Sequence, residues 1–205
     1  MISLPRLFSY RTQNDIDKYV DAVMSVEGQI SRAEAWKLIE LAGKVPAGNV
    51  IVEIGTYRGR STVALAIGSI LGNRSRVYAV DPHLEFEGVL GGHFGPNDQA
   101  ELYRNLVQAG VGHVVAVVSL SSQAVAQAWT QKNVGLLWID GDHRYGAVSA
   151  DYSCWSRFVV QDGLVAFHDQ SVPGVRQLIG ELVGDGQLVP AGNVESLSWF
   201  NPACE

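Results

Sequence analysis

The sequence predicts an α/β fold with a doubly wound, Rossmann-like, mostly parallel sheet, preceded by N-terminal helices. Two observations lead to this class. After residue 46, short apolar runs alternate with longer segments of helical periodicity, and the first run ends in a glycine-containing loop that opens a helix. The 205 residues, 47% of them hydrophobic, suffice for one domain with a sizeable core. We expect a helical extension over residues 1–45 and the α/β domain over residues 46–205.

The extension contains two predicted helices. Residues 14–24 carry apolar side chains at helical spacing. The second helix follows Ser31, because Ser31 and Glu34 have the spacing of a capping box, in which each side chain binds the backbone amide of the other residue. Gly43 and Pro46 end this helix.

The apolar runs predict strands at residues 50–54, 76–80, 114–118, 135–139 and 164–167, and the segments between and after them predict helices at 61–71, 98–109, 121–130, 147–158 and 174–183. Continuous apolar runs are typical of parallel strands covered by helices on both faces. The tail, with strands at 187–190 and 194–200 around a turn at 191–193, predicts a hairpin that adds an antiparallel edge to the sheet.

The loop after the first strand has the pattern E-x-G-x-x-x-G, formed by Glu53, Gly55 and Gly59. Glycines permit a left-handed backbone or a close approach to a ligand, and the first amides of the following helix, from Ser61 onward, are free to bind polar groups. The spacing differs from the dinucleotide pattern G-x-G-x-x-G, and Glu53 would repel phosphate. A nucleotide-like cofactor that carries positive charge fits this loop better than NAD.

Polar residues follow the later strands, where ligands of open α/β sheets collect. Asp81 follows the second strand, at a position that suits a ribose diol, and Ser119 and Ser121 follow the third. Two charged groups come directly after the fourth and fifth strands: Asp140, Asp142 and His143, then His168 and Asp169. Carboxylates and imidazoles at adjacent strand ends can hold a divalent cation, supply a general base, or do both.

Composition and net charge limit the classes of molecule that the protein is expected to bind. The net charge of −6 offers no basic patch for nucleic acid or an anionic membrane, so a small neutral or polar substrate is favoured. Two cysteines, Cys154 and Cys204, form no disulfide framework, and no apolar stretch is long enough to span a bilayer, which predicts a cytoplasmic protein. The glycine-rich segment 85–97 is expected to be a loop beside the site, either an ordinary connection or part of a lid.

The stretches 52–61, 80–82, 137–143 and 167–169 together resemble motifs of the class I S-adenosylmethionine-dependent methyltransferases, and of a small bacterial subgroup related to macrocin O-methyltransferases and cephalosporin-hydroxylase-like proteins. The resemblance implies a seven-stranded sheet with an antiparallel last strand, and S-adenosylmethionine bound by residues 46–205. The implied cofactor-binding residues are Glu53, Gly55, Thr56, Tyr57, Gly59, Ser61, Asp81, Ser119, Leu120, Ser121 and Asp140. Residues 55–59 would line the methionine portion, Asp81 would hold the ribose and residues 119–121 would flank the adenine.

The resemblance also implies magnesium, because metal-dependent relatives bind it at positions that correspond to Asp140, His168 and Asp169. His168 departs from their pattern, since those relatives carry another acid there. The expected reaction is O-methylation of a small-molecule hydroxyl, with Asp142 or His143 as the base. Without a metal, His143 or His168 alone could be the base. A non-catalytic S-adenosylmethionine-binding protein and an NAD-dependent dehydrogenase are the competing hypotheses. The sequence leaves the acceptor and homo-oligomer formation open.

Overall fold

The computed structural model describes residues 13–130 and 133–203. A seven-stranded sheet forms the centre of this part of the chain, in the order β5-β2-β1-β6-β7-β9-β8. Its parallel strands follow the order of the predicted runs: β1 (Val50–Ile54), β2 (Val77–Val80), β5 (Val115–Val118), β6 (Val134–Ile139) and β7 (Val159–Phe167). The predicted α/β class with a mostly parallel sheet is confirmed.

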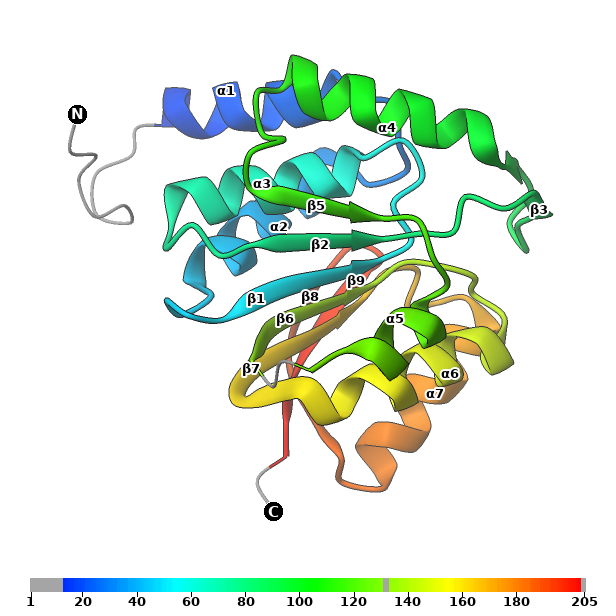
Figure 1. Ribbon diagram of the computed structural model, residues 1–205. Coiled ribbons are helices and arrows are strands. Elements are labelled where there is room, and N and C mark those ends of the chain that lie inside the picture. Colours follow the sequence, from blue (N-terminus) through cyan, green and yellow to red (C-terminus); the bar gives the residue numbers. More distant parts are fainter. Residues whose placement is uncertain (1–12, 131–132, 204–205) are drawn as a thin grey trace.

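Helices cover both faces of the sheet (Figure 1). One layer contains α1 (Gln13–Met24), α2 (Arg32–Lys44), α3 (Arg60–Leu71) and α4 (Pro96–Gln108). The other contains α5 (Ser122–Ala128), α6 (Tyr145–Trp155), which continues into a 3₁₀ turn at Ser156–Phe158, and α7 (Pro173–Gly184). Side chains of the central strands alternate between the layers: Ile51 and Trp138 pack in the α1–α4 core, and Val52 and Leu137 in the α5–α7 core. These strands are apolar throughout because both of their faces are buried.

The C-terminal hairpin consists of β8 (Leu188–Val194) and β9 (Leu197–Pro202). Its last strand, β9, is antiparallel to β7, as predicted, but it lies between β7 and β8, so β8 forms the edge. The turn predicted at 191–193 was wrong. These residues belong to β8, which has a register shift between Pro190 and Gly192, and the chain turns at Glu195 and Ser196. The Gly-Asn pair therefore marks an irregularity in a strand rather than its end.

Two other segments differ from the expectation. The glycine-rich segment contains a short antiparallel pair, β3 (Phe86–Glu87) and β4 (His93–Phe94), rather than only loop. The N-terminal helix α2 packs closely on α3 of the α/β domain. The two backbones are so near each other at Gly68 of α3 that a Cβ there would lie 2.3 Å from the Ile39 carbonyl oxygen of α2. A domain boundary near residue 45 stays a prediction. Residues 1–12 and Cys204 lie outside the described residues. Among the described residues, no helix is long and apolar enough to cross a membrane.

Candidate active site

The loop after β1 is held in a conformation that requires glycine at position 55. Gly55 has φ +83°, and a Cβ there would lie 2.3 Å from the carbonyl oxygen of Asp140 at the end of the neighbouring strand β6. The loop thus lies directly against the end of β6, which brings the first motif and the first charged group together. The close approach that the structure shows at Gly55 is to backbone, and the expected approach to a ligand stays a prediction.

Asp81, at the end of β2, fixes this loop from the other side. Its Oδ2 accepts hydrogen bonds from the Thr56 amide at 2.8 Å and the Tyr57 amide at 3.3 Å, and its Oδ1 accepts one from the His83 amide at 2.8 Å. The Thr56 hydroxyl also donates to Oδ2 at 3.3 Å, whereas among the described residues Oδ1 accepts only the His83 amide, so Oδ1 has room for a ligand hydroxyl. Asp81 therefore orders the loop in addition to the ribose role that the resemblance implies.

Glu53 lies beneath the loop and is fully buried. The Ser61 hydroxyl donates to its Oε1 at 2.5 Å, whereas Oε2 has no hydrogen-bond partner among the described residues. Burial raises the pKa of Glu53 to about 8, and the charges of Asp140 and Asp81 act in the same direction. Glu53 is therefore neutral at pH 7 and cannot supply a full negative charge to a cofactor.

The charged groups after β6 and β7 form one cluster. His143 Nε2 lies 3.5 Å from Asp140 Oδ1 and 3.4 Å from Asp169 Oδ2, and His168 Nδ1 lies 3.1 Å and 3.4 Å from the same two oxygens. Burial alone would lower the pKa of His143, but the two carboxylates raise it above its usual value. The structure therefore brings together four of the five predicted residues.

Asp142 turns away from that cluster. Its carboxylate accepts hydrogen bonds from the Arg144 amide at 3.1 Å and from Arg144 Nη1 at 2.9 Å. Arg144 Nη2 also donates to the Glu87 carbonyl oxygen of β3 at 3.0 Å, so it ties the β3–β4 pair to the site. Both carboxylate oxygens of Asp142 are thus occupied by Arg144, which distinguishes Asp142 from His143.

A second set of contacts holds the other ring nitrogen of His168, Nε2. Its Nε2 lies 3.0 Å from the Ser196 hydroxyl and 3.4 Å from Glu34 Oε2, and the Ser196 amide donates to Glu34 Oε1 at 2.9 Å. Burial opposes ionisation of both side chains. Hydrogen bonds from His168, Ser196 and the Ser31 amide nevertheless lower the pKa of Glu34 to about 2. The carboxylates of Asp140, Asp169 and Glu34 raise the pKa of His168 to about 12. His168 is therefore a buried imidazolium among three carboxylates.

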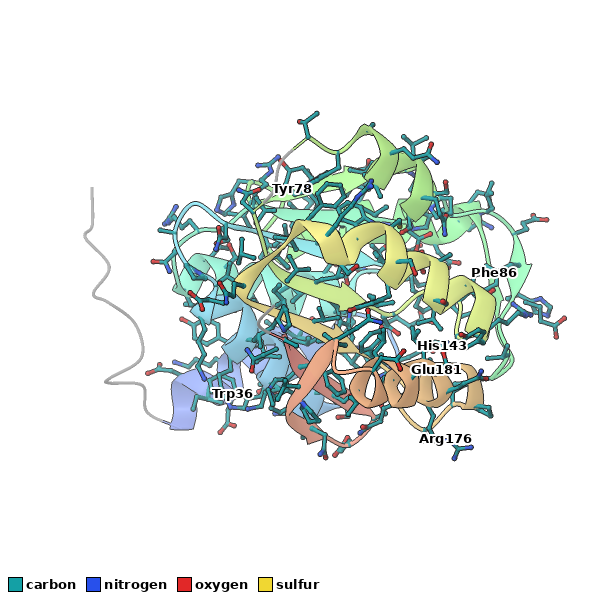
Figure 2. All side chains as sticks on the ribbon, turned by 90° about the horizontal axis from the view of Figure 1, so that it is seen from below. Trp36, Tyr78, Phe86, His143, Arg176 and Glu181 are labelled. Carbon is teal, nitrogen blue, oxygen red and sulfur yellow. The ribbon has the colours of Figure 1, made fainter. Side chains whose placement is uncertain are left out.

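A cavity of about 330 Å³ runs along the carboxyl ends of the strands. The predicted site residues that line it are Gly55, Thr56, Tyr57, Ser61, Asp81, Ser121, Asp140, Asp142 and His143. The predicted residues outside its lining are Glu53, Gly59, Ser119, Leu120, His168 and Asp169. Leu120 is 56% exposed, and Ser119 binds the side chain of Gln99 instead. Figure 2 shows His143 and Phe86, both lining residues, at the same edge of the molecule.

Comparison with known proteins identifies the family. Residues 52–170, more than half of the chain, match the model of a family described as a methyltransferase domain. The chain belongs to this methyltransferase family. The match covers the loop after β1, Asp81 and both charged groups, which are the stretches that carry the resemblance seen in the sequence.

Solved structures of methyltransferases share the fold. The O-methyltransferase TomG from Streptomyces achromogenes, in complex with S-adenosylmethionine, has a TM-score of 0.64 at 16% identity, over 95% of this chain and 92% of TomG. A methyltransferase from Podospora anserina bound to S-adenosylhomocysteine has a TM-score of 0.66 at 12% identity, with 96% and 91% covered. An O-methyltransferase from Thermotoga maritima has a TM-score of 0.63 at 14% identity, with 91% and 72% covered.

Several lining residues of this methyltransferase domain were not predicted. They include residues 28–30, Gln123, Arg144 and Asp151. Phe86 and Phe94 also line the cavity and come from the segment 85–97 that was expected beside the site. Asp151 could have been recognised from the sequence, because it shares the buried face of α6 with Val148, Tyr152 and Trp155, where a carboxylate is unexpected. The sequence does not indicate that residues 28–30 line the cavity, because they come from the N-terminal segment and reach the cavity only through the packing of α2 on α3.

The charged cluster offers a mixed set of possible metal ligands. Asp140, His143 and His168 present one ligand atom each within 4.8 Å of one another. Magnesium prefers oxygen ligands in octahedral geometry, whereas here two imidazoles stand beside the carboxylates of Asp140 and Asp169. His168 also has acceptors at both ring nitrogens, which favours a proton on each and leaves no lone pair for a metal. The residues present do not fit a magnesium ion.

Proposed function

We propose that this methyltransferase transfers the methyl group of S-adenosylmethionine to a hydroxyl of a small-molecule acceptor, with His143 as the base. The observation that carries the proposal is a single cavity that joins the ordered loop after β1 and Asp81 to the imidazole of His143. The binding of S-adenosylmethionine by TomG and of S-adenosylhomocysteine by the Podospora anserina protein, both of this fold, supports the cofactor.

The acidic pair Asp140 and Asp169 would orient the base. Both carboxylates face Nε2 of His143, so this nitrogen carries the proton and Nδ1 remains basic. S-adenosylmethionine, held by the loop after β1 and by Asp81, would supply an activated methyl group and would leave as S-adenosylhomocysteine. His143 would take the proton of the acceptor hydroxyl. The two carboxylates then stabilise the imidazolium, as a single acid does in a catalytic triad.

The β3–β4 segment supports a small acceptor with apolar surface. Phe86 stacks on Phe94 with ring centroids 4.8 Å apart, and Phe94 meets the edge of Tyr57 at 5.2 Å. Leu84 and Leu90, which are 69% and 62% exposed, lie on the same segment, and all of these side chains line the cavity. An apolar wall that is exposed without a ligand is typical of a binding site, and it would act here as the predicted lid.

The experiment is a screen for conversion of S-adenosylmethionine to S-adenosylhomocysteine with pools of phenols, sugars and hydroxy acids, each run with and without EDTA. We expect turnover on a hydroxyl acceptor that EDTA leaves undiminished, because no step uses a metal. Binding of S-adenosylmethionine without turnover on any pool would favour the non-catalytic alternative. Turnover abolished by EDTA and restored by magnesium would contradict the metal-free base.

A further inference from the structure

One buried acid in the cavity wall has no part in the proposed chemistry. Asp151, on α6, is 5% exposed and lines the cavity, yet within residues 13–130 and 133–203 it forms no ion pair with a cation. The Gln123 side-chain amide donates to its Oδ1 at 3.2 Å, and Ser122 also hydrogen-bonds to it. Burying a carboxyl group without a cation is costly, so this position calls for a partner.

The other carboxylate oxygen lies near the strand end. A Cβ on Gly141 would be 3.6 Å from Asp151 Oδ2 and 3.6 Å from the Ile54 side chain, so glycine leaves this oxygen uncovered by a side chain at that position. Asp151 therefore lies in the cavity wall with one oxygen held by α5 and the other beside Gly141, just past the end of β6. An incoming donor group can reach it there.

The chemistry of the cavity indicates which part of the cofactor reaches Asp151. At the end formed by the α1–α4 layer, Arg60 and the N-terminus of α3 favour a carboxylate, as the amino-acid part of S-adenosylmethionine provides. Asp81 follows β2, between the two ends, at the position that suits a ribose. The opposite end, formed by α5 and α6, carries Gln123 and Asp151 and remains for the purine base.

We propose that Asp151 determines base specificity by accepting a hydrogen bond from the 6-amino group of adenine. The inference rests on the proposed use of S-adenosylmethionine and assigns a role to a residue outside all the motifs of the sequence. The donor comes from the ligand because Asp151 offers acceptor oxygens and forms no ion pair among the described residues. Gln123 positions the carboxylate through its contact with Oδ1.

This role predicts discrimination between 6-amino and 6-oxo purines. In S-inosylhomocysteine an oxygen replaces the 6-amino group, so its lone pairs would face the carboxylate and the hydrogen bond would be lost. Sites built to bind a ligand donor reject analogues that lack it far more strongly than apolar contacts do, because their buried polar groups are left unpaired.

The test is calorimetric binding of S-adenosylhomocysteine and S-inosylhomocysteine to the full chain, to Asp151→Asn and to Asp162→Asn. Asp162 is an exposed acid in β7 outside the cavity lining and serves as the matched control. We expect the parent protein and the control to prefer S-adenosylhomocysteine by about 30-fold or more. In Asp151→Asn, whose amide nitrogen can donate to the 6-oxo group, the preference should fall to a few-fold or less.

Each outcome decides the inference. Equal affinity of the parent protein for the two ligands would overturn the role of Asp151 while leaving the proposed function intact, and this result does not depend on any variant folding. An unchanged preference in folded Asp151→Asn would overturn it as well. If neither ligand binds the parent protein, the proposed function fails and the inference fails with it.

Discussion

The two sides of the cavity are built differently. On the β1–β2 side, backbone amides define the site: Asp81 accepts three of them, and the conformation of Gly55 is set by contact with the backbone of β6. On the β6–β7 side, side chains define it, and the carboxylates approach the His143 nitrogen at 3.4–3.5 Å rather than at short hydrogen-bond distances. We infer that cofactor binding depends on a rigid backbone and the reaction on adjustable side chains.

The largest effect is expected on the side-chain side. His143→Ala should lower the methyl-transfer rate by about 10² to 10⁴, the usual contribution of a positioned base, and should leave S-adenosylhomocysteine affinity unchanged. Steady-state rates and calorimetry measure the two quantities. Asp142→Asn is the matched comparison, because Asp142 is already paired with Arg144 and should lose much less rate. Equal losses in both variants would remove the distinction between them.

On the backbone side, Gly55→Val should both destabilise the fold and abolish cofactor binding. The branched side chain meets the Asp140 carbonyl and must also adopt positive φ, so we expect a loss of roughly 3 kcal/mol or more in the free energy of unfolding. Gly48→Val is the control. Gly48 has φ +90° with open space around a Cβ, so this variant shows the backbone strain alone, about 1 to 2 kcal/mol. Denaturant unfolding that gives the two variants equal losses would contradict the steric role of the contact.

Asp81→Ala should weaken S-adenosylhomocysteine binding by about tenfold or more, because it removes charge-assisted hydrogen bonds from the loop and from the ribose hydroxyls. The loop amides of Thr56 and Tyr57 also lose their acceptor, so part of the loss should appear as faster hydrogen exchange at these two amides in the free protein. Protection unchanged from the parent protein would show that the loop does not need Asp81.

The smallest effect concerns Glu53. Its pKa in the folded protein, about 8, lies above the ordinary value of 4.5, so the folded state holds the proton more tightly than the unfolded state. The free energy of unfolding should therefore fall as the pH rises from about 4.5 through about 8. Glu53→Gln cannot ionise and should lose less stability than the parent protein between pH 5 and pH 8.5. Denaturant unfolding at both pH values measures the difference, and identical losses would contradict the raised pKa.

The sheet could be predicted from the sequence because its signals are local. Each parallel strand is a continuous apolar run, and β1 was predicted with its observed bounds. The hairpin turn was misplaced because Gly192 and Asn193 suggest a turn, whereas pairing with Trp199 and Ser198 keeps both residues in β8. Cross-strand pairing is a long-range property that a local turn signal does not reveal.

The candidate site, like the sheet, could be predicted only where its signals are local. Asp140, His143, His168 and Asp169 could be placed together because the carboxyl ends of parallel strands share one edge. The role of Glu34 could not, since its local pattern is fully explained by a capping box with Ser31, which the structure contains. Its contact with His168 joins residues 134 positions apart and follows only from the position of α2 beside the end of β7 and the turn between β8 and β9.

The turn at Ser196 has a consequence for how the protein forms. Ser196 contacts both Glu34, near the start of the described chain, and His168, so this cluster joins the first and the last parts of the structure. During synthesis, the loop after β1 and its Asp81 contacts can form long before residue 196 emerges. We expect an incompletely folded chain to acquire its nucleotide-binding loop early and its fixed His168 last, which ties catalytic competence to completion of the C-terminal hairpin.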